Sequence, residues 1–188
     1  MTGEPDGPAS TLPGVEYGRI QRHADERGSF RELWRDEAFP GERFVQANLS
    51  TSSKGVLRGL HLHRRQTDLW IVAQGRAQVA LVDVRPLLGR TGPTALVETR
   101  ELGEDEWVVI PTGVAHGFLA LEQLQLIYFV TNLYDGTDEL GFAWDDPAVG
   151  VPWAAVEGTP DGRPILSGRD TSNPSLRELV DKLAAPEA

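Results

Sequence analysis

Three histidines and one aspartate stand at spacings that could bring their side chains into one cavity. His61 and His63 lie two residues apart in the segment RGLHLH, so on a β-strand both imidazoles would point to the same face. Asp68 follows five residues later, and His116 lies further along in the segment PTGVAHGF. Imidazoles and a carboxylate can bind a divalent metal ion, and an imidazole can also remove a proton from a substrate. The pattern therefore indicates either a metal site or a site of acid–base chemistry.

Turn-forming residues surround these groups in a regular register. The chain contains Gly55-x5-His61-x-His63-x4-Asp68-x6-Gly75, and then Pro111-x-Gly113-x2-His116. This arrangement resembles the two-part motif of the cupin superfamily, except that metal-binding cupins usually have Glu at the position of Asp68. The resemblance implies a barrel whose strands aim the imidazoles and the carboxylate inward.

The rest of the chain predicts short strands that could build such a barrel. Segments 76–83, 107–110 and 124–130 are apolar or alternate in polarity, and turn residues separate them. The 20 glycines and 13 prolines are spread along the chain rather than gathered in a linker. We therefore expect an all-β fold, a sandwich or barrel with a short C-terminal helix, and the resemblance to cupins implies that it is a cupin jelly roll.

The two ends of the chain differ from this middle part. Residues 1–14 are rich in Gly and Pro and carry little apolar mass, which predicts a disordered tail. Residues 15–170 are expected to form the cupin domain. Residues 171–188 are expected to contain the helix, with Asn173 as its N-cap, Pro174 at its first position and apolar residues at helical spacing over 176–183.

Composition excludes several classes of function. Acidic residues outnumber basic ones by 28 to 18, and the net charge of −10 argues against nucleic acid as a partner. There is no cysteine, which excludes disulfides, thiolate zinc sites and cysteine nucleophiles. No apolar run approaches the ~20 residues of a membrane span, and the first residues do not resemble a secretory signal. We expect a cytoplasmic protein without a membrane partner.

A second resemblance extends from about Asp25 to Asp170. The segments that carry it are DERGSFRE (25–32), QANLS (46–50), GVLRGLH (55–61), VDVR (82–85), IPTGVAHGF (110–118), YDG (134–136), WDDP (144–147) and LSGRD (166–170). In this order they resemble the dTDP-4-dehydrorhamnose 3,5-epimerase family. The resemblance implies an isomerase that removes a proton next to the ketone of a dTDP-4-keto-6-deoxyhexose and so epimerises C3, C5 or both.

The resemblance also assigns roles to individual residues. His61 is the base, and Asp170 pairs with it to set its tautomer and to support the imidazolium. Tyr134 matches the acid that returns a proton from the other face of the sugar. The residues implied to bind the substrate are Arg27, Phe30, Glu32, Gln46, Asn48, Arg58 and His116. The resemblance implies no cofactor, a nucleotide-sugar substrate and a homodimer.

Two departures from the family pattern leave room for a different chemistry. Asp68 stands where the family usually has a Lys near the enolate oxygen, and His63 restores the cupin metal spacing. The chain could therefore be a metal-dependent cupin, a dioxygenase or a metal-assisted isomerase, with a divalent metal bound by His61, His63, Asp68 and His116. A metal-bound His61 could not also be the base. We favour the base and no metal, because Tyr134 and Asp170, which a metal enzyme would not need, are both in place. A sugar 3,4-ketoisomerase and a non-catalytic sugar-binding cupin are also compatible with the sequence.

Overall fold

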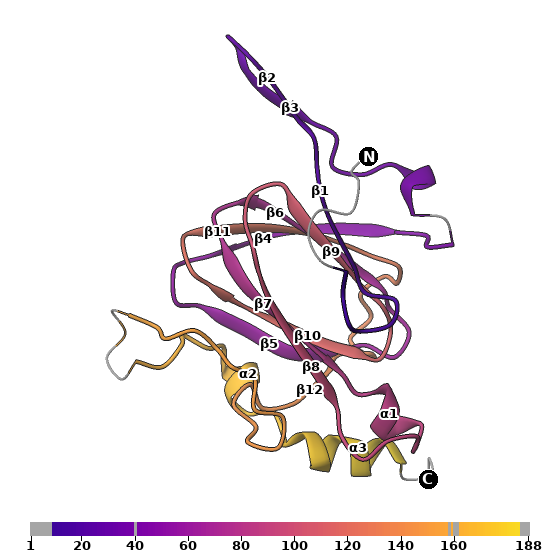
Figure 1. Cartoon of the computed structure of the whole chain (residues 1–188). Helices are drawn as coiled ribbons and strands as arrows, with labels where there is room; N and C mark the ends of the chain where they lie inside the picture. Colours follow the sequence, from indigo (N-terminus) through magenta and orange to yellow (C-terminus); the bar gives the residue numbers. More distant parts are fainter. Residues whose placement is uncertain (1–8, 40, 158, 160–161, 185–188) are drawn as a thin grey trace.

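The computed structural model describes residues 9–39, 41–157, 159 and 162–184, and two five-stranded sheets dominate it (Figure 1). The first sheet has the strand order β1-β9-β6-β11-β4, namely β1 (Glu16–Arg19), β9 (Glu106–Ile110), β6 (Asp68–Gln74), β11 (Leu124–Val130) and β4 (Gln46–Ser52). The second has the order β12-β5-β10-β7-β8, namely β12 (Leu140–Gly141), β5 (Leu57–Leu62), β10 (Val114–Ala120), β7 (Ala77–Asp83) and β8 (Leu96–Leu102). The two sheets face each other, which confirms the predicted all-β cupin fold.

The remaining elements lie outside the sandwich. The strands β2 (Arg22–Asp25) and β3 (Gly28–Arg31) form a hairpin that projects away from both sheets (Figure 1). The helical elements are the 3-10 helix η1 (Asp36–Ala38) and the α-helices α1 (Arg85–Leu88), α2 (Gly168–Thr171) and α3 (Leu176–Ala184).

The alternation of side chains along the strands divides the interior into an apolar part and a polar part. The inward face of β6 carries Asp68, Trp70 and Val72 in turn, and the inward face of β10 carries His116 and then Phe118. Trp70, Val72 and Phe118 belong to the apolar core between the sheets. The polar residues at the ends of these rows line a cavity instead.

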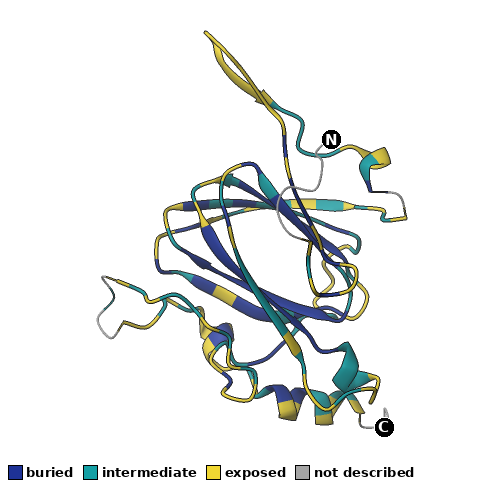
Figure 2. Cartoon of the chain, viewed as in Figure 1, coloured by how far each residue is buried: buried dark blue, intermediate teal, exposed yellow. Residues whose placement is uncertain are grey.

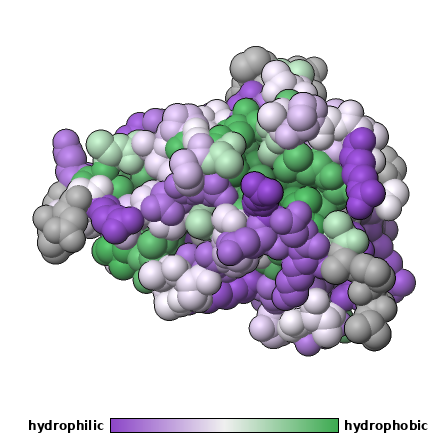
Figure 3. Space-filling view, turned by 90° about the horizontal axis from the view of Figure 1, so that it is seen from below, coloured by the Kyte–Doolittle hydropathy of each residue, from purple (hydrophilic) through white to green (hydrophobic). Residues whose placement is uncertain are grey.

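A layer of helix and loop covers the outer face of the second sheet. Leu176 and Leu179 of α3 pack on this face, against Leu60, Leu62, Ala80 and Val82 of the sheet. Strand β7 is consequently buried along its whole length (Figure 2). Seen from below, the molecule presents hydrophilic side chains next to patches of hydrophobic surface (Figure 3).

The predicted disordered tail is wrong for its last residues. Leu12 is only 2% exposed and belongs to the core between the sheets. The backbone N–H and the hydroxyl of Thr11 both donate to the Glu98 carboxylate, at 2.8 Å each. The buried Leu12 side chain, the Glu98 carboxylate and the Arg85 guanidinium, which donates to the Pro13 carbonyl at 2.7 Å, thus hold residues 9–14 against the sandwich. Residues 1–8 lie outside the described residues.

The predicted start of the C-terminal helix is also wrong. Helix α3 begins at Leu176, because Ser175 and Glu178 cap it reciprocally. The backbone N–H of Ser175 donates to the Glu178 carboxylate at 2.8 Å, and Asn173 and Pro174 precede the cap. Residues 185–188, the end of the predicted helix, lie outside the described residues.

Among the described residues, no helix is both long and apolar enough to cross a membrane. The cytoplasmic location stays a prediction.

Candidate active site

A cavity of about 430 Å³ opens between the two sheets at the polar ends of their inward rows. Strands β4, β5, β6, β10 and β11 all contribute to its wall. The polar and aromatic residues that line it are Gln46, Asn48, Ser50, Arg58, His61, His63, Gln66, Asp68, Trp70, His116, Phe118, Tyr128, Tyr134, Glu139 and Arg169. The histidines singled out by their spacing therefore share one cavity.

His61 and Asp170 form a hydrogen-bonded pair, although 109 residues separate them along the chain. His61 lies near the end of β5, and its Nε2 is 2.7 Å from Oδ1 of Asp170. Ser167, the N-cap of α2, donates its hydroxyl to the other carboxylate oxygen at 2.8 Å. Asp170 itself is 4% exposed and does not line the cavity.

The charge of Asp170 sets the tautomer of His61. Burial raises the pKa of Asp170, but the hydrogen bonds with His61 and Ser167 and the nearby positive charges bring it below its usual value. The carboxylate is therefore ionised at neutral pH and can only accept hydrogen bonds. His61 must then donate from Nε2, so that its Nδ1 carries the lone pair that can take a proton.

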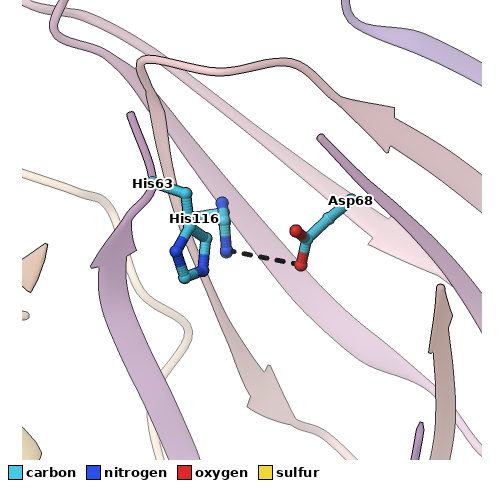
Figure 4. Close-up of side chains that lie close together, drawn as sticks. All are labelled: His63, Asp68 and His116. Atoms are coloured by element: carbon cyan, nitrogen blue, oxygen red, sulfur yellow. Dashed lines mark ion pairs between the residues drawn. The ribbon is translucent and has the colours of Figure 1, made fainter. Parts of the chain in front are cut away.

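His63, Asp68 and His116 form a second, fully buried group (Figure 4). Each offers one ligand atom, and the three atoms lie within 4.8 Å of one another. His116 Nε2 is 3.8 Å from Oδ2 of Asp68. His61 does not belong to this group, so the four-residue metal set suggested by the sequence is not assembled as a unit.

Burial dominates the electrostatics of this group. It raises the pKa of Asp68, against the lowering effects of His63 and of hydrogen bonds from Gln66 and Trp70. Burial also lowers the pKa of His116, and the charges of His63 and His61 lower it further. His116 is accordingly neutral at pH 7.

Two tyrosines line the cavity, and only one of them was predicted. Tyr134 lies in the loop after β11 and is 72% exposed, and its backbone N–H donates to Gln46 at 3.2 Å. Tyr128 lies on β11 itself and is half-buried, and burial raises its pKa. The alternation of β11 would have identified Tyr128, because it shares the inward face with Leu126 and Val130.

The residues predicted to bind the substrate fall into two groups. Gln46, Asn48, Arg58 and His116 all line the cavity, and Gln46 donates to Asn48 at 2.9 Å. Arg27 and Phe30 lie on the projecting hairpin, and Glu32 follows it; none of these three lines the cavity. Phe30 is 69% exposed, Arg27 pairs with Asp25, and Glu32 pairs with Arg35 at 2.6 Å.

Sequence reasoning missed several residues of the cavity wall besides Tyr128. Gln66 and Trp70 both donate to Asp68, at 2.7 Å and 3.1 Å. Arg169 lies next to Asp170 in the sequence and pairs with Glu139 at 2.6 Å across the cavity rim. The positions of Gln66 and Trp70, two residues to either side of Asp68, were the available signal for their role.

Comparisons with known proteins show which family the chain is similar to. The model of the protein family described as dTDP-4-dehydrorhamnose 3,5-epimerase matches residues 9–178. The spore coat polysaccharide biosynthesis protein SpsL of Bacillus subtilis is 40% identical over 148 residues, covering 76% of this chain and 96% of that protein. The dTDP-4-dehydrorhamnose 3,5-epimerase of Salmonella typhimurium is 36% identical over 184 residues, covering 91% and 95%.

Solved structures show the same fold. The rmlC epimerase of Mycobacterium tuberculosis superposes with a TM-score of 0.81 at 30% identity, covering 97% of this chain and 92% of that chain. The RmlC epimerase of Legionella pneumophila, in complex with dTDP-4-keto-L-rhamnose, gives a TM-score of 0.79 at 26% identity, covering 96% and 97%.

Proposed function

The chain belongs to the dTDP-4-dehydrorhamnose 3,5-epimerase family, and from that premise we propose how its own residues carry out the reaction. The protein is an enzyme, an isomerase that epimerises a dTDP-4-keto-6-deoxyhexose. The reaction removes a proton from a carbon next to the ketone and returns a proton from the opposite face of the ring. It therefore needs a base and an acid on opposite sides of the substrate.

His61 is the base in this proposal, and its pairing with Asp170 is the observation that carries it. The ionised carboxylate holds Nε2–H at 2.7 Å, so the lone pair of Nδ1 is free to accept the substrate proton. When His61 becomes an imidazolium, the same carboxylate stabilises the new charge. Asp170 is thus a positioning residue that acts through His61.

Tyr128 is the better-placed acid of the two tyrosines. His61 lies on β5 of the second sheet and Tyr128 on β11 of the first, so they approach the cavity from opposite walls. Burial raises the pKa of the Tyr128 phenol, so this side chain is neutral at pH 7 and carries the proton that an acid must return. Tyr134, which the sequence suggested as the acid, lies exposed at the cavity mouth, where we propose that it contacts the substrate.

The nucleotide sugar is proposed to enter through this mouth. Arg58 lies on the cavity wall, where its guanidinium can pair with the diphosphate. It is held by hydrogen bonds from its Nε to Ser52 at 3.1 Å and from an Nη to the Thr51 carbonyl at 3.4 Å. The amides of Gln46 and Asn48 then supply neutral polar contacts.

NMR of dTDP-4-keto-6-deoxyglucose with the enzyme in D2O tests the base assignment. The native chain should introduce deuterium at C3, C5 or both, and His61→Asn should slow this exchange by about 10²–10⁴-fold. The matched control is His23→Asn, an exposed histidine on the hairpin, which should exchange at the native rate. Unchanged exchange in His61→Asn would show that another group takes the proton.

We also propose a homodimer in which the hairpin of one chain completes the cavity of the other. The hairpin carries Arg27 and Phe30 away from the chain's own cavity. Strand β4 is an edge of the first sheet, and Leu49 on it is exposed, as is Val45 just before it. Unpaired edge backbone and exposed apolar side chains favour association with a second copy.

Mixing two inactive variants tests this arrangement. One variant carries His61→Asn and the other carries Arg27→Ala with Phe30→Ala, so each lacks a different part of the site. If the hairpin serves the partner, mixed dimers regain one intact site each, and about one quarter of all sites recover activity. No recovery in a mixture that native mass spectrometry shows to contain mixed dimers would contradict the proposal.

A further inference from the structure

We propose that His63, Asp68 and His116 bind one divalent transition-metal ion beside His61, without using His61 as a ligand. The three side chains are buried, line the cavity and bring their ligand atoms within 4.8 Å of one another (Figure 4). An ion about 2.0–2.2 Å from each ligand needs ligand atoms roughly 3–4 Å apart. The 3.8 Å between His116 Nε2 and Asp68 Oδ2 already meets this need.

The hydrogen bonds around the two histidines leave their free nitrogens as acceptors. Nδ1 of His63 is 2.7 Å from the carbonyl oxygen of Asp138, and Nδ1 of His116 is 3.1 Å from that of Val114. A carbonyl oxygen can only accept, so both Nδ1 atoms carry the proton in the neutral rings. Each Nε2 then has a lone pair, and among the described residues neither one has a hydrogen-bond partner.

The carboxylate is held in the same way. Gln66 donates to one oxygen of Asp68 at 2.7 Å, and the Trp70 indole N–H donates to the other at 3.1 Å. Two imidazole lone pairs and a carboxylate thus face one another in a buried space with no donor between them. Hydrogen bonds to the far side of each ligand are the arrangement that surrounds bound metals in proteins.

The donor set indicates the class of ion. Two imidazoles and one carboxylate suit Fe²⁺, Co²⁺, Ni²⁺ or Zn²⁺ better than Mg²⁺ or Ca²⁺, which prefer oxygen ligands. Three protein ligands leave a coordination position open toward the cavity. His61 keeps its bond to Asp170, so a metal and the base are compatible in this chain.

A role for the ion rests on the proposed function. The base His61 lies directly opposite His116 in the pairing of β5 with β10, so the ion would lie close to the reacting ketone. When bound, it supplies positive charge there, where Arg169 is paired with Glu139 and Arg58 is proposed to pair with the diphosphate. Metal binding itself does not depend on this role.

The first experiment measures metal binding by the tag-free full chain. The protein is stripped with a chelator, dialysed and titrated with Co²⁺ and Zn²⁺, and bound metal is measured by mass spectrometry and by the visible Co²⁺ absorption. We expect one equivalent per chain and a Co²⁺ spectrum typical of nitrogen and oxygen ligands. Failure of the native protein to bind either ion would overturn the proposal without any variant.

Variants locate the site. Asp68→Asn and His63→Gln should abolish binding, and Gln66→Leu, which removes only a hydrogen bond to the carboxylate, should weaken it by about 10–100-fold. His23→Gln is the matched control and should bind as the native chain does. His61→Asn should also keep the metal. If this variant failed to bind the metal, the assignment of His63, Asp68 and His116 as the three ligands would be overturned.

Deuterium exchange separates the role of the metal from the function. Exchange that is lost on stripping and restored by the metal would support the role. Equal exchange by the stripped and the loaded enzymes would overturn the role of the ion in the reaction but not the proposed metal-binding site. Absence of exchange from the loaded enzyme would instead contradict the proposed function.

Discussion

Replacing Asp170 with Asn tests whether this buried carboxylate sets the tautomer of His61 and stabilises its imidazolium. The substitution keeps the size of the side chain and removes its charge. In the native protein this carboxylate accepts from His61 at 2.7 Å and from Ser167 at 2.8 Å. The Asn amide has one oxygen that accepts and one nitrogen that donates, where the carboxylate has two accepting oxygens. It therefore cannot accept from His61 with one atom and from Ser167 with the other.

The size of the expected loss follows from these two bonds. A charge-assisted hydrogen bond contributes about 1–2 kcal/mol more than a neutral one, which is roughly a 5–30-fold loss of imidazolium stabilisation. If the amide nitrogen faces His61, it donates to Nε2 and moves the ring proton to Nδ1, which removes the lone pair from the cavity. Loss of the correct tautomer in a comparable histidine–carboxylate pair costs about 10⁴-fold. We therefore expect kcat/KM to fall by about 10²–10⁴-fold.

The assay is steady-state epimerisation together with deuterium exchange, with dTDP binding as the control. Asp170 does not line the cavity, so the affinity for dTDP should stay native in Asp170→Asn. Ser167→Ala removes one donor to the carboxylate and the N-cap acceptor of the Asp170 backbone N–H, and it should cost about fivefold in kcat/KM. A folded Asp170→Asn variant that loses less than about fivefold in kcat/KM would refute the coupling of Asp170 to the base.

Three further predictions concern the acid, the hairpin anchor and the N-terminal segment. Tyr128→Phe should reduce epimerisation by about 10²–10⁴-fold, and Tyr134→Phe by clearly less, as product NMR would show. Asp105→Asn should lower the free energy of unfolding by about 1–2 kcal/mol in urea titrations, because its carboxylate binds two arginines of the hairpin at 2.6 Å and 2.7 Å. Burial raises the pKa of Asp105, but these arginines bring it below its usual value; the contribution is therefore present above about pH 4 and is lost as the pH falls through the lowered pKa. Leu12→Ala should cost about 2–5 kcal/mol, and a change near zero would mean that residues 9–14 do not pack in solution.

Local patterns in the sequence predicted the all-β class and three of its strands, whereas the cupin jelly roll was implied by a family resemblance. Segments 76–83, 107–110 and 124–130 lie within one residue of β7, β9 and β11, because alternation and flanking turn residues act over a few positions. The start of α3 was misplaced because Pro174 has a helix-starting pattern, while the reciprocal cap lies one residue later at Ser175. The last residues of the predicted tail were misassigned because residues far along the chain, among them Glu98 and Arg85, hold them.

Strand alternation predicted that His61 and His63 lie on one face, and the resemblance to cupins implied that Asp68 and His116 share their cavity. The tertiary structure shows which of these side chains interact. His61 pairs with a carboxylate 109 residues away, and backbone carbonyls orient the rings of His63 and His116 toward Asp68. It also decided that Phe30 stands on a hairpin away from the cavity. Spacing along a strand is local, whereas the partner of each ring nitrogen depends on which distant segments the sheets bring into contact.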